Sequence, residues 1–247
     1  TMVSLPIKFK KALMIIGAFF WSSIYLTAQT PGLGTWNVLT GRFNYNSKWN
    51  AFIELQLRSQ QTFNHFNYHE VKGGIGYAIH PTLTAVIGTG RYITYQLNDN
   101  FKTPFLVTEN RLWQQLIWNQ SFKNVRIEHR LRAEQRYTSN GYRNRFRYRL
   151  SGIIPINNKT ITNKTLFINT SNEFHLNNEG VFFEQNRYYL GGGYNFNSQL
   201  SLQVGWIYRS DFFTQNRAQY KHFLQTSLQF TFSKSKNAAI KNIGSVD

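Results

Sequence analysis

The chain has 247 residues, with 28 Lys and Arg against 11 Asp and Glu, which gives a formal net charge of +17. Because it contains no cysteine, a disulfide scaffold, a thiol nucleophile and a thiolate metal site are excluded. The aromatic content of 17% is too high for a disordered basic tail. The mean hydropathy of −0.42 excludes a bundle of membrane-spanning helices, but not a transmembrane β-barrel, whose strands are only half apolar.

The first 28 residues follow the order of a secretory signal peptide. A basic segment with Lys8, Lys10 and Lys11 precedes an uncharged apolar stretch over 12–26, and small residues come next. This stretch is shorter than the roughly 20 residues that a membrane-spanning helix needs. We therefore expect residues 1–28 to be a removable signal peptide, which is usual for proteins of the bacterial envelope.

From Gln29 to Phe232 the sequence alternates between apolar and polar residues at period two, which predicts strands. The runs are about twice as long as the five or six residues of strands in soluble sandwiches, a length that suits a tilted strand crossing a membrane. Aromatic residues gather at the ends of the runs, as an interfacial girdle requires. The runs cover 34–45, 49–61, 67–79, 82–96, 105–121, 124–137, 143–155, 165–176, 183–196, 199–210 and 219–232.

The breaks between these runs alternate between tight turns and longer polar segments. Tight turns are expected at 46–48, 80–81, 123–124 and 197–198, and longer loops at 61–66, 97–104, 138–142, 177–182 and 211–218. This alternation is typical of an outer-membrane barrel with short periplasmic turns. Eleven runs are visible, but bacterial single-chain barrels have an even number of strands. We therefore expect a closed antiparallel transmembrane β-barrel of about twelve strands over 29–232, with ten as the alternative.

The most informative segments are 125–137 and 143–150, where arginine recurs at every second or fourth position. Each segment presents one charged face and one largely apolar face, because neighbouring side chains of a strand point to opposite sides. An arginine that faces lipid costs roughly 2–4 kcal/mol at the bilayer midplane. The charged faces are therefore expected to point into the lumen. The candidate lumen network is Glu109, Arg111, Arg126, Glu128, Arg130, Arg132, Glu134, Arg136, Arg143, Arg145, Arg147, Arg149, Glu173 and Arg187.

Four stretches of the sequence carry a family resemblance. They are Arg111–Leu116, Glu128–Tyr137, Tyr142–Leu150 and Phe183–Tyr194. Together they resemble the bacterial family called domain of unknown function 2490, which is found largely in Bacteroidetes and related Gram-negative bacteria. The resemblance runs from about Trp36 to Phe232 and implies an outer-membrane barrel, but no reaction. The last run ends in Phe230-Thr231-Phe232 and resembles the terminal strand read by the barrel assembly machinery. A polar tail over 233–247 departs from that pattern.

Two roles for the lumen network stay open. Arginine and glutamate on neighbouring strands can interlock and plug the barrel, so that the protein is structural and transports nothing. The excess of arginine can instead form a narrow pore or a binding site for small anionic solutes. A barrel enzyme of the envelope and a secreted basic protein that binds nucleic acid or another polyanion are further alternatives.

Catalysis has little support in the sequence. His175 lies two residues from Glu173 on the same expected face, where the pair can be a base with its orienting group or simply a satisfied polar pair. His65 and His69 lack a third metal ligand at a useful spacing. We expect no enzyme activity, catalytic residue, cofactor or metal. The expected partners are outer-membrane lipid, the assembly machinery and small anions, with no nucleic acid, and no oligomeric state follows from the sequence.

Overall fold

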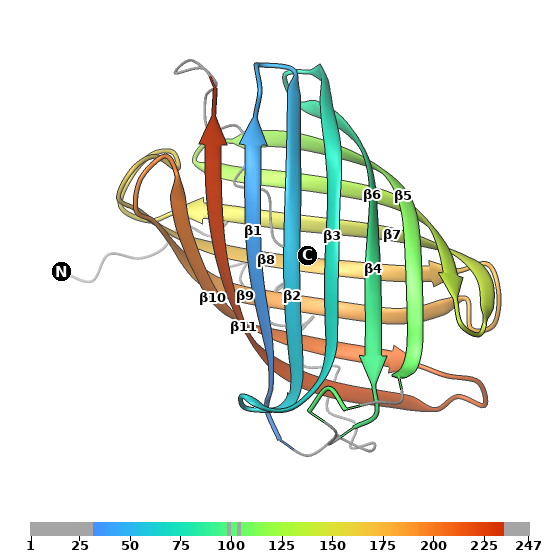
Figure 1. The fold of residues 1–247 in the computed structure, drawn as a ribbon. Coiled ribbons are helices and arrows are strands. Elements are labelled where there is room, and N and C mark those ends of the chain that lie inside the picture. Colours follow the sequence, from blue (N-terminus) through green and yellow to red (C-terminus); the bar gives the residue numbers. More distant parts are fainter. Residues whose placement is uncertain (1–31, 98–99, 103–104, 235–247) are drawn as a thin grey trace, which may run out of the picture.

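The computed structural model describes residues 32–97, 100–102 and 105–234, and these residues form one closed β-barrel of eleven strands (Figure 1). The expected signal peptide and the tail from residue 235 onward lie outside the described residues. Within the described part of the chain, no helix is long and apolar enough to cross a membrane. The strands are β1 (Gly34–Asn44), β2 (Trp49–Gln61), β3 (Asn64–His80), β4 (Leu83–Tyr95), β5 (Phe105–Phe122), β6 (Val125–Thr138), β7 (Gly141–Pro155), β8 (Thr165–Asn177), β9 (Phe183–Asn195), β10 (Leu200–Phe212) and β11 (Ala218–Ser233).

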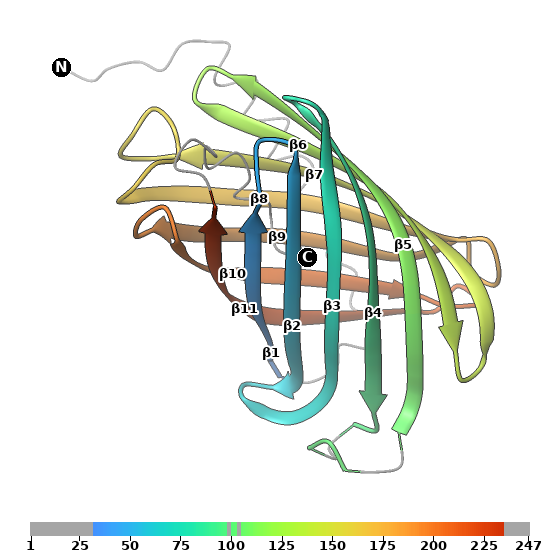
Figure 2. The same cartoon turned by 45° about the horizontal axis from the view of Figure 1, so that its top comes forward.

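The barrel closes through β1, which pairs antiparallel with β2 and parallel with β11. The expectation of twelve strands, or ten, all antiparallel, was therefore wrong for the described residues, where each of the eleven runs is one strand. Because consecutive strands run in opposite directions, an odd number brings the first and the last strand together in parallel. Figure 1 shows the arrowheads of β1 and β11 side by side at the same end, and Figure 2 shows how steeply the strands on opposite walls cross.

The two ends of the barrel differ in their connections. We call the end where β1 begins the N-end and the end where β11 finishes the C-end. The C-end carries the connections 45–48, 81–82, 123–124, 156–164 and 196–199, and the N-end carries 62–63, 96–104, 139–140, 178–182 and 213–217.

The expected contrast between short turns and long loops holds only in part. The segments 61–66 and 138–142 shrink to two-residue turns, because their polar residues continue the ladders of β2, β3, β6 and β7. The C-end also carries one long connection, 156–164, beside its short turns. Polar composition alone therefore does not mark a loop in this barrel, since polar strand ends pair like any others.

The wall is apolar on the outside. Leu131, Phe146, Leu116 and Ile53 are all exposed, and similar aliphatic residues occupy the outward positions of the other strands. On β6 the even positions Arg130 and Arg132 are buried while the odd positions face outward. The strand period therefore places the charged face inside the barrel and the oily face outside, as the sequence indicated.

Candidate functional site

The inward faces of β6 and β7 bring like charges directly opposite one another. Arg130 pairs in register with Arg149, Arg132 with Arg147, and Arg136 with Arg143. Like charges at directly opposed positions destabilise a sheet. The pairing is therefore tolerable only if carboxylates from the same and neighbouring strands lie between the guanidinium groups.

Arg147 on β7 provides the central link between these carboxylates. Its Nη1 lies 2.8 Å from Oε1 of Glu134, and its Nη2 lies 2.8 Å from Oε2 of Glu173. Arg130 reaches Glu173 from the other side at 2.5 Å, and Arg149 lies 3.2 Å from Glu128. Each of these side chains is almost entirely shielded from solvent, so the geometry of the pairs decides whether they stabilise the barrel.

His175 belongs to the same central group. Its Nε2 lies 3.2 Å from Oε2 of Glu173, and its side chain is fully buried. Glu173 also pairs with Arg130 and Arg147, so the histidine belongs to a buried polar network. The structure thus brings Glu173 and His175 into contact on the inward face, as their spacing predicted, and Nδ1 of His175 is buried without a hydrogen-bond partner among the described residues.

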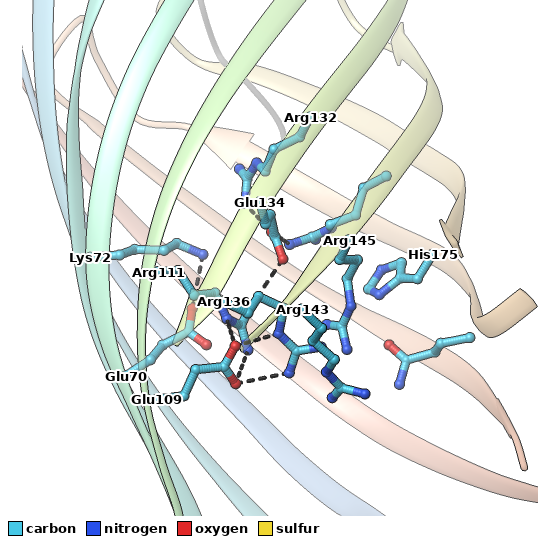
Figure 3. A network of polar contacts seen from close by, with 12 residues as sticks. Glu70, Lys72, Glu109, Arg111, Arg132, Glu134, Arg136, Arg143, Arg145 and His175 are labelled. Carbon is cyan, nitrogen blue, oxygen red and sulfur yellow. Dashed lines mark hydrogen bonds and ion pairs between the residues drawn. The ribbon is translucent and has the colours of Figure 1, made fainter. Parts of the chain in front are cut away.

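Glu109 on β5 organises the part of the network nearer the N-end. It accepts hydrogen bonds from Nε and Nη2 of Arg111 at 2.7 and 3.1 Å, and from Nη2 of Arg136 at 2.8 Å. Figure 3 shows these three residues together, with Arg143 and Arg145 close by and Glu134 deeper in the barrel. Paired guanidinium forks on one carboxylate are among the strongest charge-assisted contacts in proteins.

The structure places eleven of the fourteen residues of the expected lumen network in buried positions. Three of the set, Arg126, Arg143 and Arg187, are half-buried. The pattern at period two was sufficient to find them, because β6 and β7 are regular over the segments that carry the arginines.

A second group of charges was missed on β2 and β3. Nζ of Lys72 lies 2.8 Å from Glu54 and 2.9 Å from Glu70, and Arg58 lies 3.1 Å from Glu70. The signal was present, since Glu70 and Lys72 flank Val71 in the same alternating pattern. It is weaker than in β6 because only two charged positions carry it before Gly74 follows.

Two chambers of different size lie inside the described part of the barrel, and basic residues outnumber acidic ones around both. The N-end chamber has a volume of about 290 Å³, and eight arginines and two glutamates are among the residues around it. The C-end chamber is much smaller, at about 50 Å³. The arginines of the N-end chamber are Arg58, Arg111, Arg136, Arg143, Arg145, Arg147, Arg187 and Arg209, and its glutamates are Glu70 and Glu109.

A layer of buried side chains separates the chambers, and we call it the partition. On each of the strands β2, β5 and β6, one almost completely buried residue lies between the residues that border the two chambers. These residues are Gln56, Trp113 and Glu134. Trp36 from β1 joins this layer by donating from Nε1 to Oε1 of Gln56 at 2.8 Å. A mixed aromatic and polar layer therefore lies between the two chambers along these strands.

Glycines on the wall make room for the rings of this layer. A Cβ atom at Gly88 would lie 2.1 Å from Cζ2 of Trp113, and one at Gly193 would lie 2.3 Å from Cζ of Phe167. These distances are far below van der Waals contact, so the positions opposite the rings require a residue without a side chain. Gly88 and Gly193 therefore allow close packing against rings of the neighbouring, directly paired strands.

Aromatic rings also hold several arginines of the N-end chamber. The guanidinium carbon of Arg58 lies 3.4 Å from the ring centroid of Trp36 and 4.1 Å from that of Tyr68. Arg209 stacks over Phe223 at 5.2 Å. Cation–π contacts fix a guanidinium without cancelling its charge. The chamber therefore combines rigidly placed arginines with a positive potential.

Over residues 33–221 the sequence matches the model of a family described as protein of unknown function (DUF2490). Searches of the curated proteins and of the solved structures gave no match. The family match covers most of the barrel, from the start of β1 into β11, and agrees with the resemblance carried by the Arg and Glu motifs. The chain belongs to the DUF2490 family.

Proposed function

We propose that this protein is a bacterial outer-membrane barrel that binds small anionic solutes in its N-end chamber. The outward face supports the membrane location. Aliphatic side chains such as Ile53, Leu131 and Val204 are exposed around the middle of the barrel. Exposed aromatic residues lie near both ends, with Trp49 and Trp118 at the C-end and Tyr137 at the N-end. An apolar band between two aromatic girdles is the usual exterior of such barrels.

The binding role rests on one observation, the N-end chamber with eight arginines and two glutamates around a volume of about 290 Å³. Arginines held in a low-dielectric wall raise the local concentration of anions. Planar guanidinium groups also match carboxylate and phosphate oxygens in pairs. The volume suits a small solute, and the position inside a closed wall favours such a solute over nucleic acid.

The partition favours binding over passage. An anion that enters the N-end chamber meets Trp113 and Glu134, which fill the lumen below it. The sequence left the salt-bridge plug and the anion site as alternatives. In this proposal they share one lumen, since Arg111, Arg136 and Arg147 belong to the network and also border the chamber. In our proposal the chamber is open to the cell exterior, since four of the five connections at the C-end are the short turns typical of the periplasmic side. The proposal assigns no reaction to the protein.

The location is tested by fractionation. The protein should stay in the outer-membrane fraction after a high-salt wash, and its band should shift when the gel sample is boiled. Release by salt would instead indicate a basic soluble protein held by charge.

Binding is tested by calorimetric titration of citrate into the purified barrel at low ionic strength. Arg187→Gln, inside the chamber, should weaken citrate binding about tenfold or more, the usual loss for a charged hydrogen-bond partner. Arg217→Gln removes the same charge from an exposed position of the N-end connection 213–217 and should change little. Equal loss in both variants, or no binding by the unaltered protein, would refute the assignment to the chamber.

A further inference from the structure

Glu184, at the start of β9, breaks the alternation of its strand. His175 of β8 pairs with Gln185, but the next residue of β8, Leu176, pairs with Phe183. Glu184 is therefore the extra residue of a β-bulge. Bulges are frequent at barrel rims, where they redirect a side chain. In a regular strand Glu184 would share the outward face of Tyr188 and Leu190, and the bulge turns it toward the lumen instead.

The redirected carboxylate lies among three guanidinium groups. Arg145 forms the closest ion pair with Oε2 of Glu184, Nη2 of Arg143 lies 3.4 Å from Oε1, and Nη1 of Arg136 lies 3.8 Å from Oε1. All three arginines also border the N-end chamber. A single carboxylate thus occupies the point where three arginines of that chamber converge.

Glu184 differs from the other carboxylates of the network in its access to solvent. Its side chain is 20% exposed and that of Arg143 is 35% exposed, whereas Glu134 is fully buried. Its strand begins directly after the connection 178–182, and the neighbouring Phe183 packs against Phe174 and Phe212. The backbone of the bulge is therefore anchored by rings, while the carboxylate itself sits at the mouth, where a solute can replace it.

We propose that Glu184 is a built-in competitor, whose carboxylate occupies the anchoring site for the phosphate group of a soluble phosphate ester. This inference deepens the proposed function and rests on it. A phosphate monoester carries a charge of roughly −1.5 to −2 at neutral pH and presents three acceptor oxygens. Three guanidinium groups around one position match that charge and number of oxygens better than they match a single carboxylate.

The location of the three arginines favours a soluble ester over a lipid phosphate. Arg136 and Arg145 are buried inside the wall, and only the mouth of the chamber gives access to them. A lipid in the surrounding membrane would have to lift its headgroup over the rim to reach this position. A soluble ester enters the chamber directly from the aqueous side.

The test is calorimetric titration of inorganic phosphate into the purified, detergent-solubilised barrel at low ionic strength, with Glu184→Gln as the main variant. If the carboxylate occupies the site for about 90% of the time, its removal should raise the phosphate affinity about tenfold. Glu179→Gln removes the same charge from an exposed residue of the connection 178–182, and it should leave the affinity unchanged. Arg143→Gln in the Glu184→Gln protein should abolish the gain, and the heat-dependent band shift checks that each variant is folded.

The outcomes separate this inference from the function on which it rests. Unaltered protein that binds phosphate as tightly as Glu184→Gln would overturn the competitor role and leave anion binding in place. If neither protein binds phosphate or citrate, the anion-binding function itself fails. Acetate should bind at least tenfold more weakly than phosphate to Glu184→Gln, since it has one charge and two oxygens. Glycerol 3-phosphate should bind, and phosphatidic acid in mixed micelles should not compete with it; competition would instead assign the site to a lipid headgroup.

Discussion

At the scale of single residues, the protein tolerates a highly charged interior because the charges alternate in space. Arginines of β6 and β7 oppose each other in register, and carboxylates such as Glu134 and Glu173 lie between them. Burying a charge is costly unless it is paired, so each carboxylate here offsets the desolvation of several guanidinium groups. Removing one member of such a network lowers the folding stability by more than the ion pair itself contributes, since its charged partners then stay buried without an opposite charge.

Arg147 gives the sharpest test of this pairing. Arg147→Met keeps much of the side-chain volume but leaves Glu134 and Glu173 with less compensation, and it should lower the free energy of unfolding by about 3–5 kcal/mol. Arg91→Met removes a charge from an exposed position of β4 and should change that free energy by less than about 0.5 kcal/mol. Denaturant titration in detergent micelles, followed by tryptophan fluorescence, measures both. If the two variants were equally stable, the buried ion pairs would not be what stabilises the barrel.

The sequence identified most of these charged residues but not Glu184. The arginines of β6 and β7 follow strict alternation, so their side of the strand follows from their position. Glu184 is the extra residue of a bulge, and one inserted residue reverses the side that alternation assigns. A local shift of register depends on pairing between β8 and β9, which the pattern of either strand alone does not reveal.

At the scale of strands, wall glycines and lumen rings act as matched pairs on neighbouring strands. The indole of Trp113 on β5 occupies the space beside Gly88 of β4, where any Cβ atom would overlap it. The ring of Phe167 on β8 fills the space at Gly193 of β9 in the same way. The ring that packs against each glycine is set by the register between the two strands, which the sequence of either strand alone does not reveal.

Gly88→Ala tests this matching. The added methyl would lie 2.1 Å from the Trp113 ring and must displace it, so the variant should lose about 1–3 kcal/mol of stability, as overpacked cores do. Gly152→Ala is the matched control, because the nearest atom to its added Cβ is 3.7 Å away, which is ordinary contact. The midpoints of thermal or denaturant unfolding compare the two. Similar midpoints would show that the ring adapts freely and that the partition is not tightly packed.

At the scale of the whole molecule, the sequence predicted an all-β closed barrel but not its strand number. Each run of alternation corresponds to one strand, so the eleven visible runs gave the correct number. The prediction was wrong only because the number was changed to an even one. Closure depends on β1 and β11, whose residues are nearly 200 positions apart, and Gly34 pairs with Phe223 at this seam. No local pattern specifies a parallel pairing between such distant segments.

The interior is also asymmetric around the barrel axis. The seam side, formed by β1, β10 and β11, contributes the buried apolar cluster of Trp36, Val38, Ile207 and Phe223. The opposite side, formed by β5–β8, contributes most of the arginines and glutamates. Because the ring of Trp36 on the seam side meets the guanidinium groups of Arg58 and Arg187, the partition combines apolar packing with charge pairing.

The partition makes a prediction about conductance. In planar bilayers the unaltered protein should show little or no channel activity, because Trp113 and its neighbours fill the lumen between the chambers. Trp113→Ala should open a path and give channel events that favour anions, since arginines surround the N-end chamber. Trp118→Ala, on the same strand but exposed on the outside, should leave conductance unchanged once the heat-dependent band shift shows that both variants are folded. If the unaltered protein already conducts as strongly as Trp113→Ala, the partition is not a barrier and the chamber must be part of an open pore. A preference of the variant for cations would show instead that the arginine charges do not control which ions enter.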